Sequence, residues 1–127
     1  MGPEKKFETR VKAWLDSLKN VWHFKVHGTA ATGAGIPDII ACVNGVFVAL
    51  EIKSDKGRVS EIQKATLRRM DRAGALKFIV CPSNFAKIKL LIEELNAMDW
   101  EDVPFDTEEI YSYSDNNLEE WGVELYV

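Results

Sequence analysis

Two acidic residues and a lysine form the group of side chains in this sequence that could carry out chemistry. Asp38 ends the string Gly-Ile-Pro-Asp, and Glu51 stands thirteen residues later, two positions before Lys53. Mg²⁺ prefers oxygen ligands such as carboxylates, and a bound metal ion beside an ammonium group can help water attack a phosphate ester. These residue types therefore predict metal-dependent hydrolysis of a phosphodiester, provided that the fold brings them together.

The segment between the two acidic residues, IIACVNGVFVAL, is typical of two strands joined by a tight turn. Asn44-Gly45 is the strongest short signal for a β-hairpin, because both residues tolerate the positive φ of a type I′ turn. We expect strands over 37–43 and 46–53, which places the two carboxylates near one end of the same sheet. Since residues i and i+2 share a face of a strand, Glu51 and Lys53 should point the same way.

The elements around this hairpin are predicted from hydrophobic periodicity and capping signals. Ser60-Glu61-Ile62-Gln63 is a capping box that begins a helix, and Gly74 is a typical residue at which to end it. The order α-β-β-β-α-β-α predicts an α/β fold with helices on the faces of a sheet. In chain order we expect a helix over 4–19, a strand over 21–27, a small-residue loop over 28–35, the hairpin, a helix over 60–73, a strand over 76–80 and a helix beginning at 82–84.

Charge is distributed unevenly along this chain of 127 residues, whose formal net charge is −4. All 16 lysines and arginines lie within residues 1–98, together with 10 of the 20 acidic residues, so this basic body carries +6. Residues 99–127 hold the other 10 acids and neither lysine nor arginine. A basic body is compatible with contacts to phosphate, because such contacts come from local Lys and Arg rather than from net charge.

The composition predicts one folded domain with an acidic C-terminal extension over 99–127. A hydrophobic share of 46% argues against disorder, and no apolar run reaches the roughly 20 residues of a membrane span. The first ten residues lack the apolar core of a signal peptide, so we expect a cytoplasmic protein with no membrane partner. Six aromatic residues make a solvated tail improbable, and we expect the extension to pack on the body or on a partner chain. They are Trp100, Phe105, Tyr111, Tyr113, Trp121 and Tyr126.

Four residues outside the motifs are expected in the core. Cys42 and Cys81 lie in apolar, strand-like runs and should be buried thiols rather than ligands of zinc or halves of a disulfide. Trp14 and Trp22 are assigned to the core.

The string GIPDIIACVNGVFVALEIKSDKGRVSEIQ resembles the VRR-NUC family, a branch of the PD-(D/E)xK nuclease superfamily related to Holliday-junction resolvases. The resemblance covers most of residues 5–96 and consists of the small-residue loop, the Pro-Asp pair, the Glu-x-Lys triplet and the glutamine-bearing helix, in that order. It implies a restriction-endonuclease-like αβββαβ core with a mixed sheet, and a deoxyribonuclease that depends on Mg²⁺ or Mn²⁺. The compact phage and bacterial members imply action on branched DNA as homodimers.

The metal ligands follow from the chemistry of the motif. Asp38 and Glu51 would supply carboxylates, the carbonyl of Ile52 could supply a third oxygen, and Mg²⁺ keeps several waters. Lys53 could orient or deprotonate a water, or stabilise charge on the phosphoryl oxygens. Plain structural explanations are a strand-end aspartate for Asp38 and an exposed ion pair for Glu51 with Lys53.

The resemblance adds two residues from the helices. Glu8 is implied to reach the metal through a water, although it could be an exposed acid near the start of its helix. Gln63 matches the glutamine of the family helix, although as the N3 residue of the capping box it could simply bond to the N–H of Ser60, and both roles can coexist.

Four basic residues are candidates for contact with DNA: Lys25, His27, Lys56 and Arg58. Each could equally be solvated. Two other functions stay open, because the active site of this fold reads only a phosphodiester. One is a sequence-specific or linear-duplex nuclease, such as a restriction or mobile-element enzyme. The other is a nuclease-fold module that binds DNA or protein without cutting.

Overall fold

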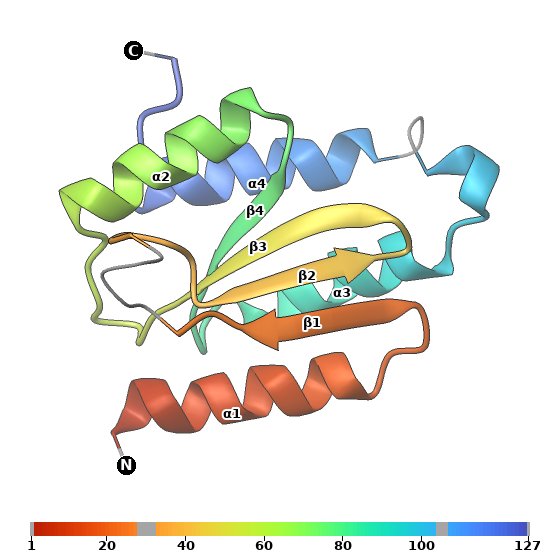
Figure 1. The fold of residues 1–127 in the computed structure, drawn as a ribbon, viewed down its shortest axis with the longest axis horizontal. Coiled ribbons are helices and arrows are strands. Elements are labelled where there is room, and N and C mark those ends of the chain that lie inside the picture. Colours follow the sequence, from red (N-terminus) through yellow and green to blue (C-terminus); the bar gives the residue numbers. More distant parts are fainter. Residues whose placement is uncertain (1, 28–32, 104–106, 127) are drawn as a thin grey trace.

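The computed structural model describes residues 2–27, 33–103 and 107–126, which form a four-stranded sheet with α-helices packed around it (Figure 1). Phe105 and residues 28–32 of the predicted loop lie outside the described residues. The elements are α1 (Pro3–Asp16), β1 (Val21–Lys25), β2 (Ile39–Val43), β3 (Val46–Ile52), α2 (Glu61–Arg72), β4 (Leu76–Val80), α3 (Phe85–Ala97), the short 3₁₀ helix η1 (Trp100–Asp102) and α4 (Glu108–Glu120). Within these ranges no helix is long and apolar enough to cross a membrane.

The sheet is mixed, in the order β1-β2-β3-β4. The first three strands pair antiparallel, whereas β4 pairs parallel to β3 after the crossover through α2. At the β2–β3 turn, Asn44 has φ of 49° and Gly45 has φ of 85°, so the predicted hairpin with a left-handed turn is confirmed. The α/β class predicted from the sequence is therefore correct.

Helices cover the two faces of the sheet with separate hydrophobic clusters. α1 and α3 pack on one face, in a large cluster that includes Phe7, Leu50, Phe78 and Ile88. α2 and α4 pack on the opposite face over β4, in a smaller cluster that includes Leu67, Ile79, Leu118 and Val123. The start of α4 also reaches the larger cluster, to which Ile110 belongs. Figure 1 shows α2 and α4 together above β4 and α1 along the other side of the sheet.

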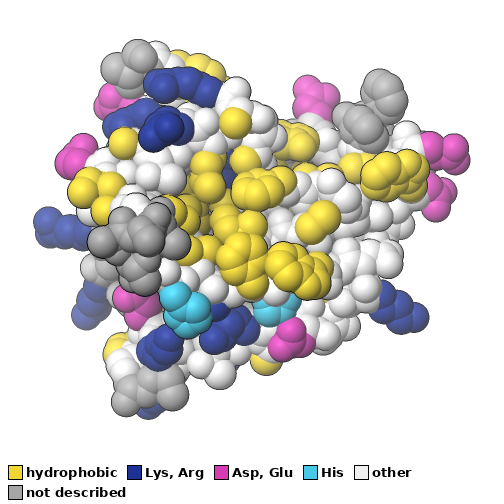
Figure 2. Space-filling view, viewed as in Figure 1, with side chains coloured by type: hydrophobic (Ala, Val, Ile, Leu, Met, Phe, Trp, Pro, Cys, Tyr) yellow, Lys and Arg dark blue, Asp and Glu magenta, His cyan; other side chains and the backbone are white. Residues whose placement is uncertain are grey.

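The face of the sheet that carries α2 and α4 is open over β1 and β2. Trp22 is 65% exposed, and Phe24 and Phe47 are also exposed. Figure 2 shows hydrophobic side chains gathered at the centre of this face. The prediction that Trp22 lies in the core is wrong, because none of the described helices covers this part of the sheet. Cys42 on β2 is likewise exposed, whereas Cys81 is buried as predicted.

Two polar side chains of α4 bond to the outer edge of β4. The N–H of Lys77 donates to Ser114 Oγ (3.3 Å), and the Ser114 hydroxyl donates to the carbonyl of Lys77. The N–H of Ile79 donates to Asn117 Oδ1 (2.7 Å), and Asn117 Nδ2 donates to the carbonyl of Ile79 (3.1 Å). These side chains make the hydrogen bonds that a fifth strand would otherwise make. The helix of the acidic extension is thus packed on the sheet of its own chain.

A buried lysine on β4 links this strand to both α2 and α4. The Lys77 side chain is 1% exposed, and its Nζ lies 2.6 Å from Asp71 Oδ1 and 3.0 Å from Asp115 Oδ1. A buried ammonium group is costly unless it is paired and hydrogen-bonded. Asp71 at the end of α2 and Asp115 on α4 meet that requirement, so the charge holds both helices to β4.

Candidate active site

Four segments of the chain bring polar and charged side chains together at the end of the sheet remote from the Asn44-Gly45 turn. The pairing of Ile39 with Leu50 sets Asp38, just before β2, beside Glu51 near the end of β3. Glu8 comes from α1 and Gln63 from the first turn of α2. An open cavity of about 240 Å³ lies here, lined by Glu4, Lys5, Glu8, Lys25, Asp38 and Ile52.

Asp38 is held by hydrogen bonds to both of its carboxylate oxygens. The backbone N–H of Ile52 donates to Oδ2 (2.7 Å), and Lys25 Nζ donates to Oδ1 (3.1 Å). The Asp38 carbonyl also accepts from the N–H of Val26 (2.8 Å), so its backbone is tied to the chain that leaves β1. Asp38 is half-buried, and it has a fixed position with one side towards the cavity.

Glu51 is a buried carboxylate with one unsatisfied oxygen. It is 2% exposed, and its Oε1 accepts a hydrogen bond from Gln63 Nε2 (2.9 Å). None of the described residues donates to its buried Oε2. Burial, and then the negative charge of Asp38, raise the pKa of Glu51 from 4.5 to about 8, although Lys53 works in the opposite direction. At neutral pH this carboxyl therefore holds a proton unless another cation takes its place.

Lys53, the residue directly after β3, places its side chain beside that of Glu51. Its Nζ is 3.7 Å from Glu51 Oε1 and donates to Gln63 Oε1 (3.1 Å). The side chain is largely buried, so the alternative of an exposed ion pair does not describe it. An ammonium group fixed beside a buried carboxylate can hold a water or a phosphoryl oxygen next to a ligand site.

Gln63 caps its helix and also contacts Glu51 and Lys53. Its Oε1 accepts from the N–H of Ser60 (2.9 Å) and its own N–H donates to Ser60 Oγ (3.2 Å), so the predicted capping box is confirmed. The same side chain bonds Glu51 through Nε2 and Lys53 through Oε1. The start of α2 and the orientation of the two charged groups are therefore coupled through one amide.

Glu8 is buried, at 4% exposure, so the alternative of an exposed acid is wrong. Its Oε1 accepts from Lys25 Nζ (2.6 Å), and its Oε2 accepts from Lys5 Nζ (3.0 Å). Burial alone would raise the pKa of Glu8, but the hydrogen bonds and charges of Lys25 and Lys5 outweigh it and lower the pKa below its usual range. Glu8 therefore stays ionised at the edge of the site.

Lys25 occupies a position that the sequence did not indicate. The sequence suggested contact with DNA, whereas its Nζ bridges Glu8 and Asp38. Burial would lower the pKa of Lys25, but hydrogen bonds and charges from the two carboxylates raise it above its usual value. The available signal was strand pairing, because Lys25 pairs with Ile39 in the sheet and so lies next to Asp38.

The other three candidate DNA-binding residues lie on the surface. Lys56 and Arg58 are exposed in the loop between β3 and α2, and His27 is exposed beyond the end of β1. They do not line the cavity beside Asp38. Contact between these residues and phosphate stays a prediction. The arrangement of the carboxylates does not depend on it.

The residues present fit a divalent cation with few protein ligands. Across the residues that the structure describes, no cluster of three or more His, Cys, Asp or Glu is arranged to hold a metal ion. Mg²⁺, however, is commonly held by one or two carboxylates and keeps several waters. Asp38 and the unsatisfied Oε2 of Glu51 match that donor set. Ile52 contacts Asp38 through its N–H, and its carbonyl remains a predicted ligand.

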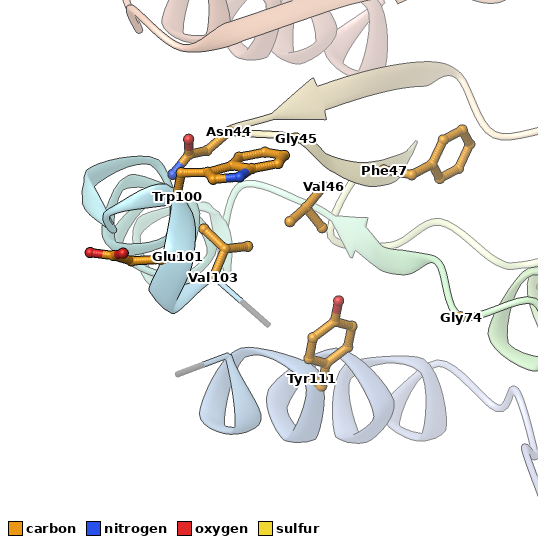
Figure 3. A pocket seen from close by; sticks show the side chains of 9 residues that line it. All are labelled: Asn44, Gly45, Val46, Phe47, Gly74, Trp100, Glu101, Val103 and Tyr111. Atoms are coloured by element: carbon orange, nitrogen blue, oxygen red, sulfur yellow. The ribbon is translucent and has the colours of Figure 1, made fainter. Parts of the chain in front are cut away.

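A larger cavity, of about 470 Å³, lies at the opposite end of the hairpin (Figure 3). Its lining is mainly apolar and aromatic, with Phe47, Trp100 and Tyr111. The Trp100 ring lies over Gly45, where a Cβ would come within 2.4 Å of it. This cavity offers little for acid–base or metal chemistry, so we place the candidate active site at the carboxylates.

Comparison of the chain with models of protein families, with curated proteins and with solved structures gives no match in any of the three. The interpretation of the site therefore rests on the motif and on the geometry of its own residues.

Proposed function

We propose that this protein is a metal-dependent endodeoxyribonuclease with the restriction-endonuclease-like core of the PD-(D/E)xK nucleases. The observation that carries the proposal is the unsatisfied Oε2 of the buried Glu51, next to Asp38 and Lys53. Burying a carboxylate oxygen without a partner is unfavourable, and such groups are commonly explained by a bound cation or a catalytic role. The proposal accounts for that oxygen and for the Pro-Asp and Glu-x-Lys motifs together.

Each residue of the site would have its own role in phosphodiester hydrolysis. A bound Mg²⁺ or Mn²⁺ would polarise the phosphate and lower the pKa of a water. Asp38 and Glu51, with the carbonyl of Ile52, would hold that ion. Lys53 would orient or deprotonate the attacking water, or stabilise the charge that develops on the phosphoryl oxygens. Gln63 would hold the side chains of Glu51 and Lys53 in position through its two hydrogen bonds.

The first test is cleavage of DNA by variants of the three central residues. Asp38→Ala, Glu51→Ala and Lys53→Ala should lose Mg²⁺-dependent cleavage while keeping the circular dichroism and cooperative melting of the wild type. Glu61→Ala, which removes an exposed acid from α2, is the matched control and should cut normally. Wild-type cleavage that survives excess EDTA would contradict a metal-dependent nuclease. Calorimetry showing no divalent-ion binding at millimolar Mg²⁺ would favour a module that binds without cutting.

We propose branched DNA as the substrate, cut in the cytoplasm of a bacterial or phage-infected cell, because of the family resemblance. Lys56 and Arg58, exposed in the loop between β3 and α2, would supply positive charge for the phosphates of such a substrate. A panel of a four-way junction, a flap and a linear duplex of matched sequence, each with Mg²⁺ and Mn²⁺, tests this. Equal cleavage of the linear duplex would favour a sequence-specific or linear-duplex nuclease instead.

We also propose that the protein acts as a twofold homodimer through the open face of the sheet. Trp22, Phe24 and Phe47 expose apolar surface there, and contiguous exposed apolar surface commonly marks an interface. Symmetric dimers are the commonest oligomers and would present two sites to two strands. Light scattering should give a dimer for the wild type and for Trp100→Glu, and a monomer for Trp22→Glu. A monomeric wild type would contradict the proposal.

A further inference from the structure

The ammonium group of Lys25 lies at the centre of the acidic cluster. Its Nζ is 2.6 Å from Glu8 Oε1 and 3.1 Å from Asp38 Oδ1, so a single positive charge joins a carboxylate of α1 to the carboxylate that precedes β2. The side chain is largely buried and ends in the lining of the cavity. Both hydrogen bonds are charge-assisted, which makes them stronger than neutral ones.

No other cation in the described part of the chain makes this bridge. Lys5 Nζ lies 3.0 Å and Lys12 Nζ 3.8 Å from Glu8 Oε2, on the opposite oxygen of that carboxylate. Lys53 contacts Glu51. Lys25 is therefore the described lysine that contacts Asp38, and Lys5 is a natural control because it is an exposed cation that contacts Glu8 alone.

The position of Lys25 conflicts with a metal ion on the same carboxylate. Asp38 Oδ2 accepts from the N–H of Ile52 at 2.7 Å, and Oδ1 accepts from Lys25 Nζ at 3.1 Å, so a metal ion on either oxygen would lie close to the ammonium group. A divalent cation and an ammonium group within a few ångströms of one oxygen repel each other strongly in a partly buried site. A metal ion bound to Asp38 therefore competes with Lys25 for this carboxylate.

We propose that Lys25 is the internal counter-cation of the site: it neutralises Glu8 and Asp38 in the metal-free protein and leaves Asp38 when a divalent cation binds. The inference rests on the proposed metal-dependent function and adds the group that limits the affinity of the site for metal. After displacement, Lys25 keeps its shorter contact to Glu8. Glu8 then acts as a positioning residue, since it holds the displaced ammonium group away from the metal.

The test is Mn²⁺ binding measured by isothermal titration calorimetry on full-length protein without DNA. We expect Lys25→Met and Lys25→Gln to bind Mn²⁺ about 10-fold more tightly than the wild type, the low end of what one nearby charge does to a charged site. Lys5→Met should stay within about 3-fold of the wild type, because that cation is exposed and does not touch Asp38. In EDTA, the melting temperature of Lys25→Met should fall below that of Lys5→Met, and saturating Mn²⁺ should raise it more.

The outcomes separate this inference from the function on which it rests. If the wild type binds Mn²⁺ and Lys25→Met and Lys25→Gln bind no more tightly than Lys5→Met, Lys25 is not the competitor and this inference alone is overturned. If neither the wild type nor any variant binds Mn²⁺, the metal site itself is wrong and both proposals are overturned. Lys25→Gln keeps a polar side chain, so it also serves if Lys25→Met does not fold.

Discussion

Replacing Glu51 with glutamine should make the metal-free protein more stable at alkaline pH. Glu51 is 2% exposed, and burial together with the charge of Asp38 raises its pKa to about 8. Ionising this carboxyl in the folded protein is therefore unfavourable, whereas a glutamine has the same shape and no charge. The expected gain in the free energy of unfolding comes from an ionisation that the wild type must undergo and the variant does not.

The magnitude follows from the difference between the folded and unfolded pKa values. In the unfolded chain Glu51 loses its proton near 4.5, but in the folded protein only near 8. Between these values the folded state binds more protons than the unfolded state, so the stability of the wild type falls as pH rises. At 1.36 kcal/mol for each pKa unit, the full loss is about 5 kcal/mol above pH 8, of which about 3 kcal/mol is present at pH 7.

Urea unfolding in EDTA at pH 5, 7 and 9 measures this loss. The stability of Glu51→Gln relative to the wild type should rise by about 4 kcal/mol between pH 5 and pH 9, and most of that rise should come before pH 8. Glu94→Gln, on the exposed side of α3, should follow the wild type at every pH. A difference between Glu51→Gln and the wild type that stays constant from pH 5 to pH 9 would refute the reasoning.

Three further predictions concern the site and the edge of β4. At pH 7 a divalent cation should displace the proton of Glu51, so calorimetric heats should vary with the ionisation enthalpy of the buffer; heats equal in all buffers would contradict this. Asn117→Leu should lower the free energy of unfolding by about 2 kcal/mol, because it leaves the N–H of the buried Ile79 unpaired, although Asn84 still donates to the carbonyl of Ile79. Asn116→Leu, at an exposed position, should change it by less than about 0.5 kcal/mol. Equal losses in a urea titration would count against that role. Ser60→Ala should lose about 1 kcal/mol of stability and keep its cleavage rate, whereas Gln63→Ala should lose both; equal cleavage rates would reduce Gln63 to a helix cap.

The parts of the fold that the sequence predicted correctly depend on local signals. Asn44-Gly45 predicted the hairpin because few residues tolerate the positive φ values that both adopt. Ser60 and Gln63 predicted the start of α2, since a capping box needs only residues three apart. The proximity of the Asp38 and Glu51 carboxylates followed from the predicted hairpin, because an antiparallel pair sets the start of one strand beside the end of the other.

The features that the sequence did not predict depend on contacts between distant segments. Trp22 alternates like a core residue, and only the placement of α2 and α4 over β4 leaves it exposed. Lys25 reads as a surface cation until β1 pairs with β2 and α1 brings Glu8 to it. Asn117 belongs to an acidic helix whose polar residues look solvated, yet it bonds the backbone of β4. Hydrophobic periodicity carries no information about such polar partners.

The closure of β4 by α4 has a consequence for the synthesis of the chain. Ile79 and the Asn117 side chain that bonds it are 38 residues apart. At roughly 5–20 residues per second, a ribosome takes about 2–8 s to add that interval. During this time the strand LKFIV has been made, but its outer edge still lacks Ser114 and Asn117, and an open apolar edge is a template for pairing with another chain. Slow synthesis of the chain between β4 and α4 therefore lengthens the period in which this edge can pair with another chain.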